Sequence, residues 1–282
     1  MRPKIWTVIL QNSLKRPDDV HASRLSLRHS RLFAFLSLAT QAETLKVKPA
    51  LNSNPERILF VGNSYYYYNN SLHNHVSNLV KASDPALGAR LLFKSSTIGG
   101  AALNHHNMAH LTEPGRIGVT QAFQWVVMQG GSGEPLSQRR REIFRQTAIA
   151  NAEMIKARGG QVALYMTHAY VSPHKQANPQ NIAATESMYV AVGNEIQALV
   201  IPVGLAFEEA YRRLPALSFH NKDGTHPSLL GTYLAACTTY ASLYGRSPVG
   251  NTYRADAAID ETVATQLQQV AQDVVTQFFQ RN

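Results

Sequence analysis

The segment Arg57–Asn70, RILFVGNSYYYYNN, constrains the fold of this chain more than any other. Its continuous apolar run, Ile58–Val61, is typical of a strand that is covered on both faces in a parallel sheet. Gly62 permits a tight turn, and Ser64 then opens a helix pattern that we expect to continue through Leu79. A serine at such a strand-to-helix turn lies at the carboxyl edge of the sheet, where open α/β sheets bind ligands.

A second segment, Asp223–Pro227 (DGTHP), supplies the groups that a serine nucleophile needs. A hydroxyl is a weak nucleophile without a base. The loop is interrupted by Gly224, so the carboxylate of Asp223 can reach one ring nitrogen of His226 while the other nitrogen faces the serine. This is the division of roles in a catalytic triad: Ser64 attacks, His226 takes its proton and Asp223 orients the ring. Free N–H groups at the start of the helix would favour a developing oxyanion.

At these residues the sequence resembles the SGNH hydrolases, also called the GDSL esterase and lipase family. The resemblance covers roughly residues 57–244. The family blocks correspond to Gly62-Asn63-Ser64, Ser96–Gly100, Gln124–Pro135 and Asp223–His226. The last block is the most specific, because a helix pattern with small residues follows it. The resemblance implies a serine hydrolase that acts on ester bonds and needs no metal or organic cofactor.

The resemblance also implies an oxyanion hole made by the backbone N–H groups of Ser64 and Gly99, with Gly100 replacing Gly99 if the register differs by one. The family's third donor is an asparagine, and this chain has none at the matching place. Aligning the glycines puts Ser132 there, and Gln129 is a second candidate donor. Loss of one such donor can lower the rate by about 10²–10³-fold, so a slow enzyme or a rebuilt hole are both open.

Three residues near these blocks are candidate substrate contacts. Asn63 stands where the family has an acidic residue. Tyr65 begins the run Tyr65–Tyr68, of which one or two side chains must face the cleft if the run is helical. Packing against neighbouring elements is the alternative for most of these tyrosines. His168 follows a strand pattern, as does Tyr170, and both fall at the carboxyl edge of the predicted sheet.

Strand and helix patterns alternate along the chain. Strands are predicted at Ile58–Val61, Arg90–Lys94, Trp125–Met128, Gln161–Met166 and Leu199–Val203. Further helices are predicted at Leu136–Lys156, Pro179–Leu199, Glu208–Leu214 and Ile259–Phe279. This alternation predicts an α/β fold, a three-layer α/β/α sandwich with a five-stranded parallel sheet. The family resemblance implies the flavodoxin-like strand order 2-1-3-4-5.

Residues 1–52 are predicted to form an extension that precedes the hydrolase domain at residues 53–282. Residues 1–50 hold nine Lys and Arg and three acidic residues, so +6 of the formal charge of +9 lies there and the body carries only +3. The apolar run Leu32–Ala39 is too short to span a bilayer but resembles a signal-peptide core. We favour a disordered or loosely packed extension; a targeting signal and sequence upstream of the natural start stay open.

The composition limits the classes of partner and compartment. The body is not a basic platform for nucleic acid, and no segment predicts an integral membrane protein. The single cysteine, Cys237, excludes an intramolecular disulfide and favours a cytoplasmic location, although the apolar run leaves export open. The histidine pairs around His73 and His105 do not predict a metal site, because no cysteine or carboxylate joins them at ligand spacing. The sequence does not indicate an oligomeric state.

The sequence therefore predicts a serine esterase that hydrolyses small acyl esters through an acyl-serine intermediate, with a small-molecule ester as its partner. Two alternatives remain open. A non-catalytic ligand-binding relative is favoured by the missing asparagine, and an acyltransferase would use the same triad with an alcohol in place of water.

Overall fold

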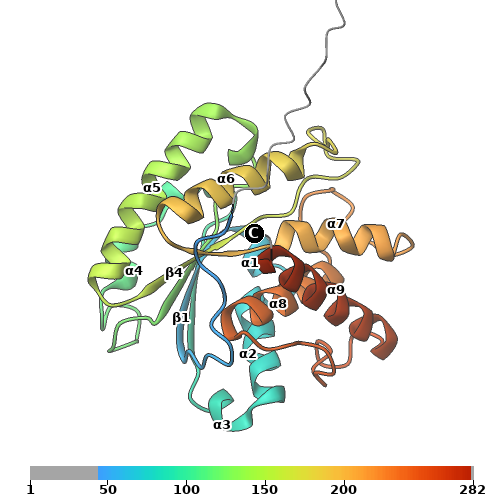
Figure 1. Cartoon of the computed structure of the whole chain (residues 1–282), viewed down its shortest axis with the longest axis horizontal. Helices are drawn as coiled ribbons and strands as arrows, with labels where there is room; N and C mark the ends of the chain where they lie inside the picture. The colour runs from blue at the N-terminus through green and yellow to red at the C-terminus, as the bar shows by residue number, and fades with distance from the viewer. Residues whose placement is uncertain (1–43, 281–282) are drawn as a thin grey trace, which may run out of the picture. The chain divides into compact units, whose positions relative to one another are not determined.

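The computed structural model describes residues 44–280 and places five strands of this part of the chain in one sheet (Figure 1). The strands are β1 (Arg57–Gly62), β2 (Leu92–Thr97), β3 (Trp125–Met128), β4 (Gln161–Tyr165) and β5 (Leu199–Ile201). Their order is β2-β1-β3-β4-β5, and every neighbouring pair is parallel. The predicted α/β sandwich and its 2-1-3-4-5 order are therefore confirmed.

The central strand β1 carries the apolar run that the sequence singled out. Residues Ile58–Val61 are fully buried, and Phe60 pairs with Ser95 on β2 and Val127 on β3. Burial of each such side chain is worth about 1.5–3 kcal/mol, so this run anchors the sheet. By contrast, β2 lies at the edge of the sheet, and Leu92 at its start is 49% exposed.

Helices cover both faces of the sheet (Figure 1). One layer contains α2 (Leu72–Ser83), α7 (Val203–Arg213), α8 (Leu229–Tyr244) and α9 (Glu261–Gln280), and α8 packs against the other three. The other layer contains α4 (Met108–Thr112), α5 (Gln138–Ala157) and α6 (Asn181–Glu195). Four short elements complete the described part: α1 (Ser64–Tyr67), α3 (Pro85–Gly88), η1 (Leu103–His105) and η2 (Glu134–Leu136). Cys237 is buried within α8, as its apolar surroundings predicted.

The helix predicted to run from Ser64 through Leu79 is interrupted. The short helix α1 ends at Tyr67, and α2 begins only at Leu72. Between them Asn69, Asn70 and Ser71 all adopt positive φ angles, of 52°, 67° and 65°. Asparagine enters this left-handed region more readily than most residues, so the two asparagines allow a break that the apolar spacing does not reveal.

Other boundaries also differ from the prediction. The helix predicted at Pro179–Leu199 is α6, which begins at Asn181 and ends at Glu195. The edge strand predicted at Arg90–Lys94 lies at Leu92–Thr97, so it reaches further toward the site. The last strand, predicted at Leu199–Val203, stops before Pro202, and α7 starts directly after this residue rather than at Glu208. Proline has no backbone N–H to continue a strand and is suited to the start of a helix, which explains both shifts.

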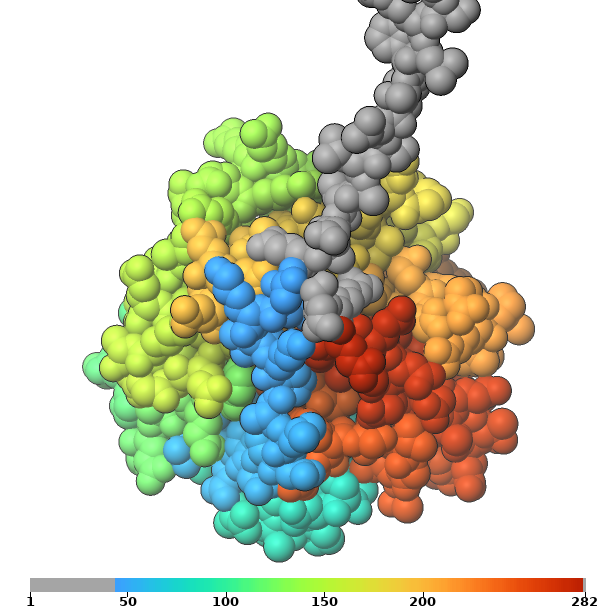
Figure 2. All heavy atoms as spheres, in the orientation of Figure 1, coloured from blue at the N-terminus to red at the C-terminus, as the bar shows by residue number. Residues whose placement is uncertain are grey.

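The first described residues, 44–56, run across the surface of the domain and are the blue strip in Figure 2. The backbone N–H of Lys46 donates to Oδ1 of Asn194 on α6 at 2.9 Å, and that of Ser53 donates to the carbonyl of Tyr244 at 3.0 Å. Residues 44–52 are thus part of the folded body. The rest of the predicted extension, including the apolar run Leu32–Ala39, lies outside the described residues.

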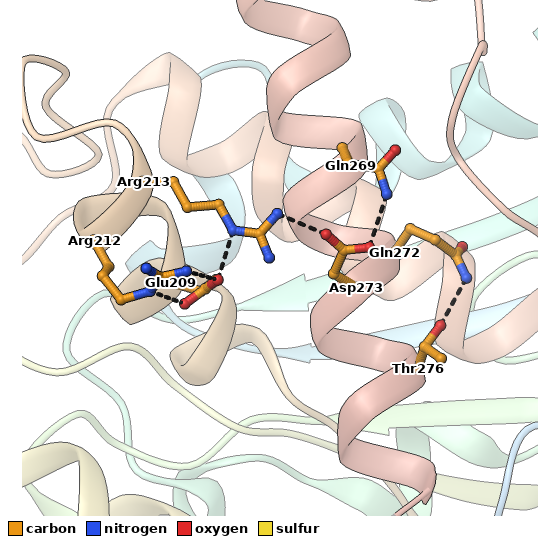
Figure 3. A network of polar contacts seen from close by, with 7 residues as sticks. All are labelled: Glu209, Arg212, Arg213, Gln269, Gln272, Asp273 and Thr276. Carbon is orange, nitrogen blue, oxygen red and sulfur yellow. Dashed lines mark hydrogen bonds and ion pairs between the residues drawn. The ribbon is translucent and has the colours of Figure 1, made fainter.

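Exposed polar side chains join α7 to α9 (Figure 3). Glu209 pairs with Arg212 at 2.7 Å and with Arg213 at 2.5 Å, and Arg213 also reaches Asp273 on α9 at 2.6 Å. Gln269 donates to the same aspartate at 2.8 Å. The pairs lie at the surface, where each contributes little to stability. None of the helices that the structure describes combines the length and the apolar character needed to cross a bilayer.

Candidate active site

Ser64 lies at the first position of α1, directly after β1 and its turn. The side chain of Asn63 caps this helix by accepting a hydrogen bond from the backbone N–H of Tyr65 at 3.1 Å. Gly62 is closely packed, because a Cβ atom there would lie 2.6 Å from Oε1 of Gln129 and 2.9 Å from Cδ2 of Tyr66. The turn therefore presents the Ser64 side chain at the carboxyl edge of the sheet, with 7% of the residue exposed.

The three predicted triad side chains form one hydrogen-bonded line. Oγ of Ser64 is 3.0 Å from Nε2 of His226, and Nδ1 of His226 is 2.7 Å from Oδ2 of Asp223. The serine and the histidine are 162 positions apart in the chain, so the fold brings them together. Because the carboxylate accepts a hydrogen bond from Nδ1–H, Nε2 carries the lone pair that can take the serine proton.

The loop that carries Asp223 fixes its carboxylate through backbone groups. Oδ1 accepts hydrogen bonds from the N–H groups of Thr225 and His226, each at 3.0 Å. Burial alone would raise the pKa of Asp223, but these hydrogen bonds and the one from the histidine ring outweigh it and lower the pKa to about 2. The carboxylate is therefore ionised at neutral pH. Gly224 in the same loop has a φ of 70°, and a Cβ atom there would clash with the carbonyl of Val171.

The ring of Tyr68 stacks on the ring of His226, with 4.3 Å between centroids and 11° between planes. Tyr67 stacks on Tyr68 in turn, at 5.6 Å, and is 43% exposed. The face of an aromatic ring attracts a cation by roughly 0.5–2 kcal/mol, so this contact would stabilise an imidazolium. Tyr65 and Tyr66 are buried. Tyr65 also meets the His226 ring edge-on, with 6.1 Å between centroids, so Tyr65 and Tyr68 are the two tyrosines of the run that contact the histidine.

A second layer of aromatic side chains lies beneath the triad loop. His168 is 2% exposed and stacks between Tyr65 and Phe207, at centroid distances of 4.1 and 4.3 Å. Nε2 of His168 donates to the Thr225 carbonyl at 2.8 Å, and the Tyr65 hydroxyl is 2.8 Å from Oγ1 of Thr225. Burial lowers the pKa of His168 well below its usual range, so the ring is neutral. This layer supports the loop that carries the base.

The three predicted substrate contacts, Asn63, Tyr65 and His168, all lie below the surface of the site. Each is at most 3% exposed. Asn63 donates to the carbonyl of Ala101 at 2.9 Å and accepts from Nε2 of Gln129 at 2.8 Å. These side chains hold neighbouring loops together, and their contact with a substrate stays a prediction.

Gln129, one candidate for the third oxyanion donor, is fully buried. Its Nε2 donates to Oδ1 of Asn63 at 2.8 Å and to the carbonyl of Gly130 at 3.0 Å. An amide nitrogen has two hydrogens, so both are occupied. The geometry therefore gives Gln129 a bracing position between the nucleophile turn and the loop after β3.

The other candidate oxyanion donors, Ser64, Gly99 and Ser132, have N–H or O–H groups that can still donate a hydrogen bond. Within residues 44–280 no protein acceptor takes the backbone N–H of Ser64 or Gly99. Ser132 borders a cavity together with Gly100, and its Oγ accepts a hydrogen bond from the Tyr170 hydroxyl at 2.8 Å. A hydroxyl that accepts one hydrogen bond can still donate its own proton. These contacts favour Ser132 over Gln129 as the third donor.

Glu134 is a residue of this edge that the sequence analysis did not single out. It is 4% exposed, and its Oε2 accepts a hydrogen bond from the backbone N–H of Gly131 at 2.7 Å. Burial raises the pKa of Glu134 to about 7, against the lowering effect of backbone hydrogen bonds from Gly131 and Leu103. Its carboxyl thus fixes the glycine loop beside Ser132. The signal in the sequence was an acid three positions after a glycine, the spacing at which a side chain can cap a loop N–H.

Both ring nitrogens of His75, on α2, lie within hydrogen-bonding distance of protein groups. Nε2 of His75 is 2.6 Å from the carbonyl of Asn69, and its Nδ1 is 2.9 Å from the Tyr253 hydroxyl. Across the part of the chain that the structure describes, no three or more His, Cys, Asp or Glu side chains gather where a metal ion could bind.

Comparisons with known proteins identify the fold. No family model matches the sequence, and a search of curated proteins gives no match. Among solved structures, a DUF4886 family protein from Bacteroides uniformis superposes with a TM-score of 0.61 at 18% identity, covering 80% of this chain and 96% of that chain. An SGNH-type hydrolase from Slackia heliotrinireducens matches with a TM-score of 0.52 at 22% identity, over 67% of this chain and 99% of that one. This chain has the SGNH hydrolase fold.

A third structure with this fold is an acetyl-xylooligosaccharide esterase from Geobacillus. It matches with a TM-score of 0.53 at 17% identity and covers 68% of this chain and 96% of that chain. At such identities the likeness concerns the fold, and the assignment of a reaction depends on the side chains at the sheet edge.

Proposed function

We propose that this protein is a serine esterase that hydrolyses small acyl esters through an acyl-serine intermediate. The observation that carries the proposal is the continuous line from Asp223 through His226 to Ser64, with hydrogen bonds of 2.7 and 3.0 Å. A carboxylate, an imidazole and a hydroxyl in this order form the arrangement that activates a serine for acyl transfer.

In the proposed reaction, Oγ of Ser64 attacks the ester carbonyl while Nε2 of His226 takes the hydroxyl proton. The ionised Asp223 holds the ring through Nδ1 and stabilises the imidazolium. His226 then gives the proton to the leaving alcohol, which departs from the tetrahedral intermediate. Water, activated by the same histidine, attacks the acyl-serine and releases the acid.

The oxyanion of each tetrahedral intermediate would accept hydrogen bonds from the backbone N–H groups of Ser64 and Gly99, with Gly100 as the alternative to Gly99. Ser132 would take the place of the family's asparagine. The unoccupied backbone N–H groups support this assignment. Apart from the ester and water, every group that this reaction uses belongs to the protein, so the proposed mechanism requires no metal or organic cofactor.

Two considerations support an ester as the substrate. The fold is shared with the acetyl-xylooligosaccharide esterase, whose name points to short acyl groups on a sugar. The triad histidine is 25% exposed at its side chain, so a small molecule can reach the reacting atoms from solvent. A small-molecule ester is accordingly the proposed partner.

Hydrolysis of p-nitrophenyl acetate by the wild-type protein and by Ser64→Ala tests this proposal. We expect turnover in the wild type and a loss of roughly 10⁴–10⁶-fold in the variant, because the nucleophile is removed. Wild-type protein that is folded but inactive toward a series of acyl chain lengths would contradict an esterase. Addition of a competing alcohol reports on acyl transfer, since a transferase would form the new ester faster than the free acid.

A non-catalytic ligand-binding protein is the second candidate, and one observation favours it. The third oxyanion donor of the family is an asparagine, whereas the matching position here is Ser132. Substitution Ser132→Asn separates the two cases. In an esterase with a rebuilt hole it would change the rate by about tenfold in either direction, whereas in a binding protein it would leave turnover absent.

A further inference from the structure

A cavity of about 400 Å³ opens beside the proposed oxyanion hole. Gly100 and Ser132, two of the proposed oxyanion donors, form part of its wall. Tyr170, which follows β4, and Arg140 on α5 also line it. None of the triad residues is among the residues that line this cavity, so it lies on the oxyanion side of the proposed site.

The polar groups of the cavity are mainly hydrogen-bond donors. Arg140 forms no ion pair with any carboxylate that the structure describes, whereas Arg145 on the same helix pairs with Glu142 and Glu195. Nδ1 of His105 accepts a hydrogen bond from the backbone N–H of Ala102 at 3.2 Å, so its Nε2 carries the ring proton. A guanidinium and an imidazole N–H thus border the same space.

Glu134 is the single acidic side chain among the residues that line the cavity. Its Oε2 accepts a hydrogen bond from the Gly131 N–H at 2.7 Å. Burial raises the pKa of this carboxyl to about 7, against the lowering effects of backbone hydrogen bonds and of the charge on Arg140, so near pH 7 it offsets the guanidinium only in part. The cavity therefore keeps an excess of positive charge. A planar guanidinium binds a carboxylate through two parallel hydrogen bonds, which is the ligand chemistry that this lining complements best.

We propose that this cavity is the acyl subsite, that it takes acyl groups ending in a carboxylate, and that Arg140 is the residue that selects them. The inference rests on the proposed esterase function. In that reaction His226 protonates the leaving alcohol, so the alcohol lies on the histidine side. The acyl chain then extends on the opposite side, along Gly100 and Ser132 and into the cavity. The substrates would be monoesters of small dicarboxylic acids.

The test compares two esters of equal chain length, mono-(4-nitrophenyl) adipate and 4-nitrophenyl hexanoate, which differ in a terminal carboxylate against a methyl group. The quantity measured is the ratio of their kcat/KM values. We expect the wild type to favour the adipate ester and Arg140→Ala to lower the ratio by about tenfold, the effect of losing one charged hydrogen-bonded pair. Arg140→Lys should retain part of the preference, because it keeps the charge but not the planar fork.

Arg139→Ala is the matched control, because Arg139 precedes Arg140 on the same helix, is also exposed and does not line the cavity. It should leave the ratio unchanged. A wild type that prefers the hexanoate ester, or an Arg140→Ala variant that keeps the wild-type ratio, would overturn the subsite while leaving the esterase proposal intact.

A binding measurement keeps the two proposals separable. Binding of mono-(4-nitrophenyl) adipate and of 4-nitrophenyl hexanoate to Ser64→Ala protein, by equilibrium dialysis, needs no turnover. If the wild type hydrolyses neither ester, the esterase proposal fails. The subsite is then supported by binding of the adipate ester that Arg140→Ala weakens about tenfold on the Ser64→Ala background, and overturned by binding that is absent or insensitive to that substitution.

Discussion

His226 belongs to the loop whose Thr225 carbonyl accepts a hydrogen bond from His168, and each of the two rings stacks on a tyrosine of the run Tyr65–Tyr68. His226 lies at the rim, 25% exposed at its side chain, between the serine hydroxyl and the carboxylate of Asp223. His168 lies inside, 2% exposed, with Nε2 bound to a backbone carbonyl and Nδ1 buried without a partner. One ring is arranged to gain and lose a proton, and the other to remain neutral.

Both residues are histidines, so the role of each at this edge is decided by the groups that contact its ring. A carboxylate on Nδ1 and a hydroxyl on Nε2 create a base, whereas two aromatic neighbours and a carbonyl create a support. The comparison gives four expectations, which run from the rim, where single changes should cost most, to the surface, where they should cost least.

The largest effect concerns the carboxylate partner of the rim histidine. Asp223→Asn replaces an acceptor with a group that can donate, and it favours the wrong tautomer of the ring. We expect kcat/KM for p-nitrophenyl acetate to fall by roughly 10³–10⁴-fold with the fold retained. The matched control is Asp260→Asn, since Asp260 also accepts two backbone N–H groups, at 2.9 and 3.2 Å, but caps α9. A small effect at Asp223 would show that the ring does not depend on its carboxylate.

The next effect concerns the ring that stacks on His226. Tyr68→Leu removes the π face that would stabilise the imidazolium, so we expect kcat/KM to fall by about 3- to 30-fold. Tyr68→Phe should retain the wild-type kcat/KM, because it keeps the aromatic face, and Tyr67→Leu serves as the control for a tyrosine one position away. An unchanged kcat/KM in Tyr68→Leu would show that this ring does not contribute to the reaction.

The buried histidines should make the free energy of unfolding depend on pH. Burial lowers the pKa of His220 to about 4, with the Ala169 carbonyl opposing the shift, and burial also lowers the pKa of His168 well below its usual range. Below pH 6.5 the unfolded chain therefore binds protons that the folded chain does not bind, so the free energy of unfolding falls as the pH is lowered. For His220 alone the loss between pH 7 and pH 5 is about 2 kcal/mol.

Glu134 acts in the opposite direction, because its raised pKa of about 7 makes the folded state bind a proton between pH 7 and 4.5 that the unfolded state does not. Burial, partial in the case of His73, also lowers the pKa values of His73, His75 and His106, so these three rings act in the same direction as His220. We expect urea denaturation to give a lower free energy of unfolding at pH 5 than at pH 7, and a steeper loss in Glu134→Gln. A free energy that rises on acidification would contradict neutral buried rings.

The smallest effect is expected at the surface network of Figure 3. The Arg213–Asp273 pair joins side chains that are 32% and 39% exposed, at 2.6 Å. Asp273→Asn should change the free energy of unfolding by less than about 1 kcal/mol and leave activity unaltered. Thermal denaturation of this variant beside the wild type measures the change. A larger loss would mean that α9 depends on this pair rather than on its buried face.

The parts of the site that the sequence predicted are those with short, local signals. An apolar run followed by a glycine turn marked Ser64, and a DxxH spacing marked Asp223 and His226. The strand order came from the family resemblance. The break at residues 69–71 was missed because positive φ angles at asparagine leave no trace in apolar spacing. The roles of His168 and Gln129 were also beyond the sequence, since both depend on contacts between segments far apart in the chain.

Labelling with a fluorophosphonate probe, read by intact-protein and peptide mass spectrometry, tests the central claim most directly. A serine whose proton His226 can take should gain one covalent adduct, on Ser64, and Ser64→Ala should gain none. Folded wild-type protein that stays unmodified, or that carries the adduct on another serine, would contradict the account.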